Sequence, residues 1–184
     1  MAYPFLKRES TGLLVIDVQD RLFAHVERNC ETLIAMQKAV QGFNLMHLPI
    51  VVTEQYPEKM GSTVKGLQPF LENASEPLSK TTFSCLADAA IRKKLLDMPI
   101  TQWVLIGIEA HVCVLQTARE LKDAGKDVVV LNDAITSRSI YDYSTAIAEM
   151  RDCGIRISSV ETVLFELMRD SKAPEFKELS ALIK

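Results

Sequence analysis

The sequence predicts an α/β protein: a three-layer α/β/α sandwich on a six-stranded, mostly parallel sheet of Rossmann-like order 3-2-1-4-5-6. Short β-rich runs alternate with amphipathic helical stretches along the chain. The β-rich runs are apolar at successive positions, which indicates strands covered by helices on both faces. Parallel crossovers are right-handed almost without exception, so one sandwich follows. The length of 184 residues suits a single domain over 1–184.

Six strands are expected, each a run of apolar and β-branched residues between turn formers. They cover residues 12–18, 48–54, 77–84, 102–108, 127–133 and 155–160. Apolar residues at helical spacing predict the helices between and after them. These cover 30–46, 86–98, 112–125, 143–154, 161–170 and 174–184. Pro99 ends the second helix, and Gly125 and Gly154 close the third and fourth.

Composition narrows the classes of partner. Lys and Arg total 21 against 24 Asp and Glu, a net charge of −3, and no run of like charge stands out. Neither a nucleic-acid surface nor a membrane contact is expected. The apolar runs are too short to span a bilayer, and the N-terminal segment lacks the apolar core of a signal peptide. We therefore expect a cytoplasmic protein.

The four cysteines are Cys30, Cys85, Cys113 and Cys153. No C-x-x-C pair occurs, and no histidine stands at ligand spacing from a cysteine. A zinc site or disulfide framework is therefore not expected, and the thiols should be reduced. Cys30, Cys85 and Cys153 are predicted to be small buried hydrophobes on helix faces.

Three residues fall where a parallel sheet binds ligands, just beyond the carboxyl ends of its strands. Asp17 ends the first strand, Lys80 lies in the extended piece 77–84, and Cys113 follows strand 102–108 where a helix begins. Three separate segments would thus bring a carboxylate, an ammonium and a thiol to one edge of the sheet.

Cys113 has the strongest physical case as a nucleophile. A helix N-terminus carries about half a positive charge, and Lys80 would add a cation, so we expect the thiol pKa to lie below about 8.5. Asp17 would accept the thiol proton and return it to a leaving amine. No metal or cofactor is required. Taken singly, each residue has a plainer interpretation as a packing thiol, a turn cap or a solvated lysine.

The strings "LLVIDVQ", "TEQYP", "SKTTFSC" and "GIEAHVCVLQTA" together resemble the isochorismatase-like (cysteine hydrolase) superfamily. The resemblance covers nearly the whole chain and is strongest to the isochorismatase domain-containing subgroup. It implies a catalytic triad in which Asp17 is the general base and Cys113 the nucleophile. Lys80 would support the thiolate and position the base.

The same resemblance implies further site residues. A non-proline cis peptide is expected between Ile108 and Glu109, just before the nucleophile. The backbone N–H groups of Glu109 and Cys113 would then form the oxyanion hole. Gln19 matches a pocket-lining position of the superfamily, and the Phe83 ring is expected to form a wall of the substrate pocket.

One departure from the superfamily bears on the substrate. Metal-binding nicotinamidases carry an Asp-x-His motif after the second strand, whereas this chain has "TEQYPEKMG" there. We therefore expect no metal and no nicotinamide. Cleavage of isochorismate needs protonation at carbon and basic partners for two carboxylates, and the strand ends offer little beyond Lys80. A small neutral amide or carbamoyl compound fits better, cleaved at its C–N bond through an acyl-cysteine.

Other functions stay open at this point. The chain could be a non-enzymatic interaction scaffold with a leftover triad, or an isochorismate-type ether hydrolase. It could also be a redox sensor, if Cys85 approaches Cys113 in space. A homo-oligomer is expected because the resemblance implies one, and because helices 161–170 and 174–184 offer more apolar surface than one core needs. His111, just before the helix, receives no role.

Overall fold

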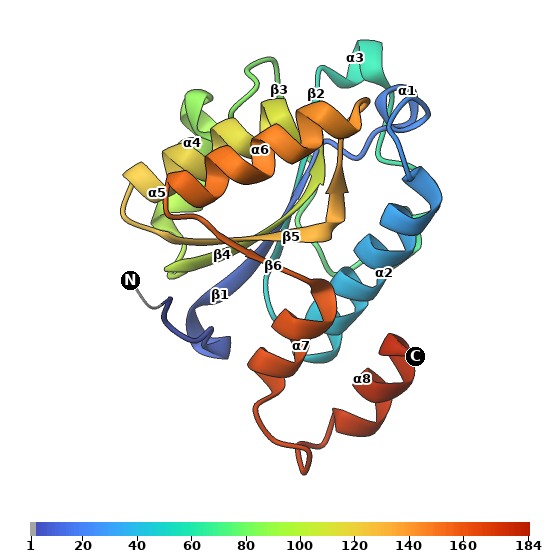
Figure 1. The fold of residues 1–184 in the computed structure, drawn as a ribbon, viewed down its shortest axis with the longest axis vertical. Coiled ribbons are helices and arrows are strands. Elements are labelled where there is room, and N and C mark those ends of the chain that lie inside the picture. The colour runs from blue at the N-terminus through green and yellow to red at the C-terminus, as the bar shows by residue number, and fades with distance from the viewer. Residues whose placement is uncertain (1–2) are drawn as a thin grey trace.

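The computed structural model describes residues 3–184 and contains one six-stranded parallel sheet between two layers of helices (Figure 1). The strand order β3-β2-β1-β4-β5-β6 confirms the predicted topology, and every neighbouring pair is parallel. The strands are β1 (Thr11–Ile16), β2 (Ile50–Gln55), β3 (Leu78–Lys80), β4 (Gln102–Ile108), β5 (Asp127–Thr136) and β6 (Arg156–Ser158).

Six helices fall in the predicted segments, with differences at their ends. They are α2 (Asn29–Leu45), α4 (Ala89–Asp97), α5 (Leu115–Asp123), α6 (Ile140–Asp152), α7 (Val160–Met168) and α8 (Phe176–Ile183). Two short helices, α1 (Asp20–Phe23) and α3 (Pro57–Met60), lie where no helix was predicted. Short 3-10 turns are η1 (Arg8–Ser10), η2 (Gln68–Phe70) and η3 (Cys85–Ala87). The helix expected over 86–98 is divided into the 3-10 turn η3 and the α-helix α4. The division falls at Asp88, whose side chain caps α4 by accepting from the N–H groups of Ala90 and Ile91.

The segment that carries Cys113 departs from a regular helix. Its first turn, η4 (Ala110–Val114), is a π-helical turn, and the α-helix proper begins only at α5. Such turns are rare and occur frequently at functional sites.

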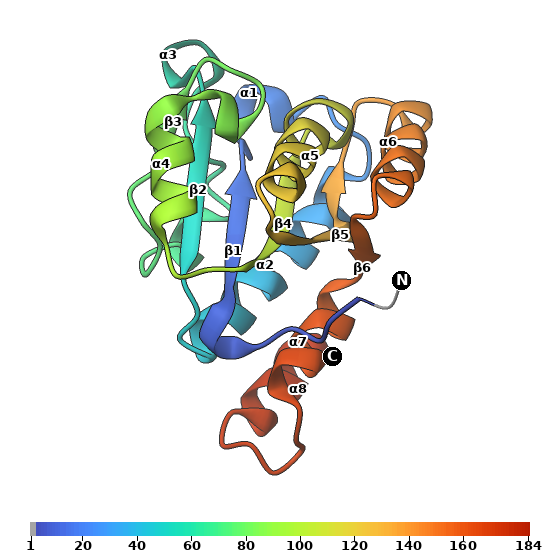
Figure 2. The same cartoon turned by 90° about the vertical axis from the view of Figure 1, so that its left-hand side faces the viewer.

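The core lies in two layers, one on each side of the sheet (Figure 2). All six residues of β1 are buried. Leu13 and Val15 pack in the layer that holds α2 and α7, while Leu14 and Ile16 pack in the layer that holds α4, α5 and α6. Burial on both faces explains why the strand sequences are apolar at successive positions.

The two C-terminal helices pack on their own domain. Both α7 and α8 contact α2, below the sheet in Figures 1 and 2. Leu164 of α7 lies so close to Gly42 of α2 that a Cβ there would stand 2.4 Å from it. Part of the apolar surface that the sequence offered to a partner is therefore used within the chain, while Phe165 stays 36% exposed.

The structure corrects two of the cysteine predictions. Cys30 and Cys153 are exposed, whereas Cys85 and Cys113 are buried. Cys30 is in the first turn of α2 and Cys153 is the C-cap of α6, so both lie at helix ends. Within residues 3–184, no helix is both long and apolar enough to cross a membrane.

Gly107 allows β1 and β4 to approach at the edge where the site forms. Its φ is +136°, and a Cβ would stand 2.1 Å from the Ile16 carbonyl oxygen. We expect Gly107→Ala to lower the free energy of unfolding by about 3 kcal/mol or more, and Tm by about 6–12 °C. Thermal unfolding followed by circular dichroism measures this.

Gly125→Ala is the matched control. This glycine also has a positive φ, +82°, but no heavy atom lies within 4 Å of a Cβ placed there. We expect Gly125→Ala to lower the free energy of unfolding by only about 1–2 kcal/mol, because only the left-handed backbone opposes the alanine. Equal losses in the two variants would show that the close approach to Ile16 does not matter.

Candidate active site

The three predicted catalytic residues meet at the carboxyl edge of the sheet, the upper end of the molecule in Figure 1. Asp17 directly follows β1, Lys80 ends β3, and Cys113 lies in the turn after β4. The strand at the centre of the three is β1, which pairs with both β2 and β4, and β2 in turn pairs with β3. The parallel register therefore brings residues far apart in sequence to one place.

Asp17 and Lys80 form a fully buried ion pair. Lys80 Nζ lies 2.6 Å from Asp17 Oδ2, and both side chains have 0% exposure. The ammonium also donates to Gln55 Oε1 at 2.7 Å and to the carbonyls of Thr82 and Phe83 at 3.1 Å each. Burying an ion costs several kcal/mol unless protein groups replace its water. Here oxygen atoms from three segments replace the water around the lysine.

The backbone and a neighbouring hydroxyl fix the Asp17 carboxylate. Its φ of 54° is left-handed, a conformation that Asp tolerates better than most residues. Its carbonyl accepts from the Gln19 N–H at 2.8 Å, which closes the turn after β1. Thr53 Oγ1 donates to Asp17 Oδ1 at 2.8 Å. Each carboxylate oxygen thus has its own donor, and the base has a defined orientation.

Cys113 is the third member, with 6% of its surface exposed. Burial raises the pKa of its thiol well above the ordinary value, and the negative charge of Asp17 raises it further, while Lys80 acts in the opposite direction. The expectation of a lowered thiol pKa is therefore wrong. The Lys80 charge is already compensated by Asp17, so little of it is left to stabilise a thiolate.

A protonated resting thiol changes the roles at the site. The proton must leave as the sulfur attacks, and the Asp17 carboxylate is the base beside it. Lys80 then acts mainly on Asp17, by holding its carboxylate in place, and less on the sulfur.

The turn before the nucleophile carries the remaining backbone features. The peptide bond between Ile108 and Glu109 is cis, at the position that the resemblance implies. The Glu109 carbonyl accepts from the N–H groups of Val112 and Val114, which folds the turn tightly over the end of β4. The N–H groups of Glu109 and Cys113, expected to bind an oxyanion, both belong to this turn.

The two predicted pocket residues differ from each other. Gln19 is fully buried, and its amide group donates to the carbonyls of Gln55 at 3.0 Å and Gly61 at 2.6 Å. Its oxygen accepts from the Gln55 N–H at 2.7 Å. Gln19 therefore braces the loop after β2 instead of offering polar atoms to a ligand. Phe83 is 56% exposed, and its carbonyl binds Lys80.

Thr53 and Gln55 were not identified from the sequence, although both bind the ion pair. A signal was present: "TEQ" ends β2, and polar residues at a buried strand's carboxyl end are where such a fold places its site. Glu54 lies between them. Its Oε1 accepts from the backbone N–H of Thr63 at 2.7 Å and from the Thr63 hydroxyl at 2.8 Å.

The second buried thiol, Cys85, lies next to the same pair. Its Sγ is 3.8 Å from Thr53 Oγ1. Burial raises its pKa to about 11, with Lys80 opposing the rise. Redox-sensing cysteines are exposed thiols of low pKa. Cys85 and Cys113 have the opposite properties, which argues against the redox alternative.

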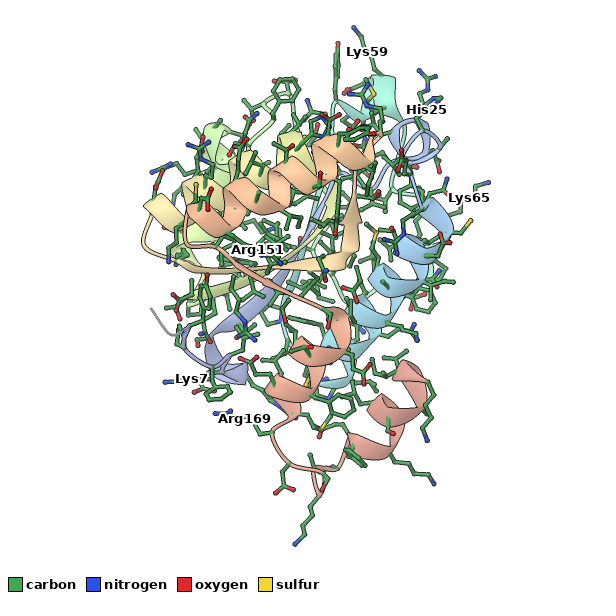
Figure 3. The ribbon with its side chains drawn as sticks, viewed as in Figure 1. Lys7, His25, Lys59, Lys65, Arg151 and Arg169 are labelled. Carbon is green, nitrogen blue, oxygen red and sulfur yellow. The ribbon has the colours of Figure 1, made fainter. Side chains whose placement is uncertain are left out.

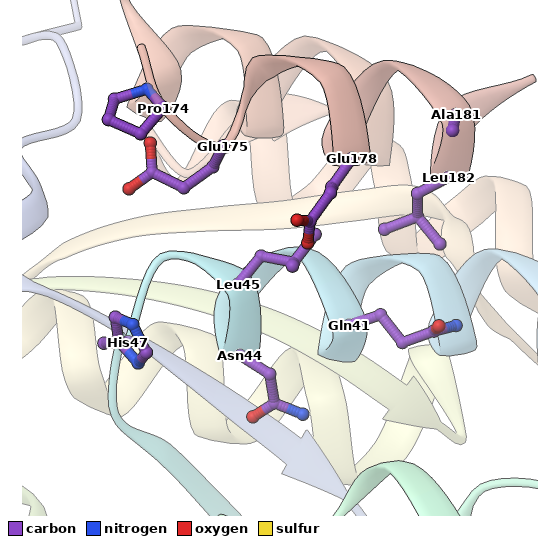
Figure 4. Close-up of a pocket in the computed structure, with 9 residues that line it drawn as sticks. All are labelled: Gln41, Asn44, Leu45, His47, Pro174, Glu175, Glu178, Ala181 and Leu182. Atoms are coloured by element: carbon purple, nitrogen blue, oxygen red, sulfur yellow. The ribbon is translucent and has the colours of Figure 1, made fainter.

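A large surface cavity lies elsewhere, between α2 and α8 (Figure 4). It has a volume of about 850 Å³. Its walls are Gln41, Asn44, Leu45, His47, Pro174, Glu175, Glu178, Ala181 and Leu182. His47 precedes β2, so the cavity opens at the amino edge of the sheet, opposite the triad. Within residues 3–184, no three His, Cys, Asp or Glu side chains gather closely enough to share a metal ion.

Comparison with known proteins places this chain in a family. The model of the isochorismatase domain family matches residues 11–162. The secreted isochorismatase effector Isc1 of Phytophthora sojae is 40% identical over 179 residues, which are 95% of this chain and 85% of that protein. Isochorismatase domain-containing protein 2 of Bos taurus is 36% identical over 181 residues, which are 95% of this chain and 83% of that protein.

Solved structures share the architecture. The MAR1 ribonuclease of Caenorhabditis elegans superposes with a TM-score of 0.91 at 32% identity, covering 98% of this chain and 92% of that one. The Escherichia coli YcaC gene product, described as an octameric hydrolase of unknown specificity, superposes with a TM-score of 0.92 at 20% identity, covering 100% and 91% of the chains. From its sequence and its six-stranded parallel sheet, this chain belongs to the isochorismatase domain family and has the fold of its hydrolases.

Proposed function

We propose that the protein is a metal-independent cysteine hydrolase that cleaves the C–N bond of a small amide or carbamoyl compound. The observation that carries the proposal is the meeting of Asp17, Lys80 and Cys113 at one buried point of the carboxyl edge. A carboxylate held beside a thiol by a lysine supplies a base and a nucleophile without further groups.

The proposed reaction has two halves. Cys113 Sγ attacks the substrate carbonyl carbon while the thiol proton passes to Asp17. The C–N bond then breaks, and Asp17 returns the proton to the leaving nitrogen, which departs as ammonia or an amine. In the second half, water attacks the thioester and gives a proton to Asp17. The C–S bond breaks, and the proton returns to the sulfur.

The oxyanion formed in each half needs donors. The backbone N–H groups of Glu109 and Cys113 are proposed for this role, because both belong to the turn that presents the sulfur. Phe83, exposed beside Lys80, is proposed as a wall of the substrate pocket.

A ribonuclease activity, named for the nematode relative, is the second possibility to test. RNA binding calls for a cationic surface that follows the phosphates. This chain has a net charge of −3. The labelled basic side chains of Figure 3 are spread from the top to the lower part of the molecule and form no single cluster: Lys7, His25, Lys59, Lys65, Arg151 and Arg169. These features favour a small substrate of low charge over a nucleic acid.

We also propose a homo-oligomer and a cytoplasmic location. YcaC is described as an octamer, and this chain exposes Phe165 of α7 and Ile34 of α2, at 36% and 54%. The four free cysteines suit a reducing compartment.

Cys113→Ala should abolish hydrolysis. We expect ammonia release from a primary amide that the wild type cleaves to fall by about 10³-fold or more, because the attacking sulfur is removed. Cys85→Ala, which removes the other buried thiol, should keep measurable turnover. Ammonia release from Cys113→Ala at the wild-type rate would refute the mechanism. RNA cleavage that requires Cys113 would show that the substrate is RNA and not a small amide.

Asp17→Asn should separate thiol reactivity from catalysis. The Asp17 charge raises the Cys113 pKa and Lys80 lowers it, so removing Asp17 alone should lower the pKa of the thiol. We expect iodoacetamide to alkylate Cys113 faster than in the wild type at pH ~8, while turnover falls by about 10²-fold or more.

Peptide mass spectrometry measures both alkylation rates, with the exposed Cys30 and Cys153 as internal references in each sample. Circular dichroism checks that the variant is folded, since breaking a buried pair costs about 3–5 kcal/mol. Slower alkylation in Asp17→Asn would mean that Asp17 does not control the thiol.

The assembly prediction is checked by size-exclusion chromatography with light scattering. One chain has a mass of 20.6 kDa, so an oligomer should give an integral multiple of this mass. Phe165→Ser should reduce the oligomer fraction if α7 lies in the interface. A wild-type monomer at all concentrations would rule the oligomer out.

A further inference from the structure

One buried carboxylate beside the nucleophile is not used by the proposed mechanism. Glu109 is 7% exposed and stands four residues before Cys113. Its Oε1 lies 2.6 Å from Arg138 Nε. Its Oε2 is buried and has no hydrogen-bond partner among the residues that the structure describes. His111 Nδ1 is 3.5 Å from this oxygen but lies 3.0 Å from Ser137 Oγ, which is the hydrogen bond it makes.

Strand register places Glu109 at the same carboxyl edge of the sheet as Asp17. Ile16 pairs with Gly107, and Ile108 pairs with Thr136. The residues that leave three adjacent strands are therefore Asp17, Glu109 and Ser137. The carboxylate follows the same strand end that presents the nucleophile, one strand away from the general base.

A buried carboxylate oxygen without a donor is costly, and in proteins such an oxygen is usually completed by an ordered water, an ion or a ligand. We infer that Glu109 Oε2 accepts an N–H group of the substrate. The substrate is then a small amide that carries a second N–H donor, an ammonium or another amide group. This inference rests on the proposed function and names the substrate class for the same site.

The ion pair of Arg138 with Glu109 affects which substrate charges the site accepts. Its side chain is 61% exposed and would by itself attract a substrate carboxylate. Glu109 Oε1 already neutralises the guanidinium, and a second carboxylate would face the charge of Glu109. The pair therefore disfavours anionic substrates and leaves Oε2 as the free acceptor.

The test uses three primary amides of matched length. These are 3-aminopropanamide with an ammonium tail, butanamide with a methyl tail, and succinamate with a carboxylate tail. For the wild type we expect kcat/KM to be highest for 3-aminopropanamide and lowest for succinamate, with about tenfold or more between them. Ammonia release measures the rates.

Glu109→Gln keeps the size of the side chain and removes its charge. We expect the ratio of kcat/KM between 3-aminopropanamide and succinamate to fall by about tenfold or more, because Arg138 is released as the acceptor is lost. Asp142→Asn is the matched control, since this carboxylate lies 3.8 Å from the other face of His111 but is 52% exposed. It should leave the ratio unchanged. A purely structural role of Glu109 would lower all three rates together and keep the ratio, which would overturn the inference.

A second readout separates this inference from the proposed function. In a Cys113→Ala background, calorimetry measures the dissociation constants of the same three amides with and without Glu109→Gln. If the wild type cleaves none of them, the amide reaction is refuted for this class, yet binding still decides the role of Glu109. Tighter binding of 3-aminopropanamide that disappears in Glu109→Gln supports the inference. Equal binding of the ammonium and carboxylate amides overturns it.

Discussion

The buried ion pair between Asp17 and Lys80 is the interaction on which the rest of the site depends. Neither charge reaches solvent, so every oxygen around the ammonium has to come from the protein. Gln55 and the carbonyls of Thr82 and Phe83 supply them, which ties the ends of β1, β2 and β3 and the loop after β3 into one unit. Because the buried ammonium needs all of these oxygens, the strand ends must keep the positions that supply them.

The sheet makes this edge possible. Neighbouring parallel strands end together, so polar residues that follow apolar runs converge without any local sequence signal linking them. The sequence predicted β4 over 102–108 with the bounds that the structure has, and it predicted the strand order, because strands buried on both faces are apolar throughout. The placement of Asp17, Lys80 and Cys113 followed from the strand ends alone.

Other features could not be read from the sequence, for identifiable reasons. Apolar periodicity does not separate a core position from one at a helix end, and so Cys30 and Cys153 were assigned to the core although both are exposed. Thr53 and Gln55 act through hydrogen bonds to residues 25 or more positions away. The pKa of the Cys113 thiol depends first on burial and then on the charges around it in space. The prediction of a low thiol pKa counted the helix end and Lys80 but omitted the charge of Asp17. That charge raises the pKa of Cys113 by more than Lys80 lowers it.

That sum of charges also bears on what the site is for. A lysine without its carboxylate would favour a standing thiolate, which oxidants and alkylating agents attack at any time. Burial and the Asp17 charge keep the sulfur protonated, and the paired lysine holds the Asp17 carboxylate in place beside it. The nucleophile is then formed only when a carbonyl carbon is present to receive the sulfur and Asp17 takes the proton. Such a site has low general thiol reactivity and reacts only with a bound, correctly placed acyl group. This property suits a hydrolase better than a redox sensor.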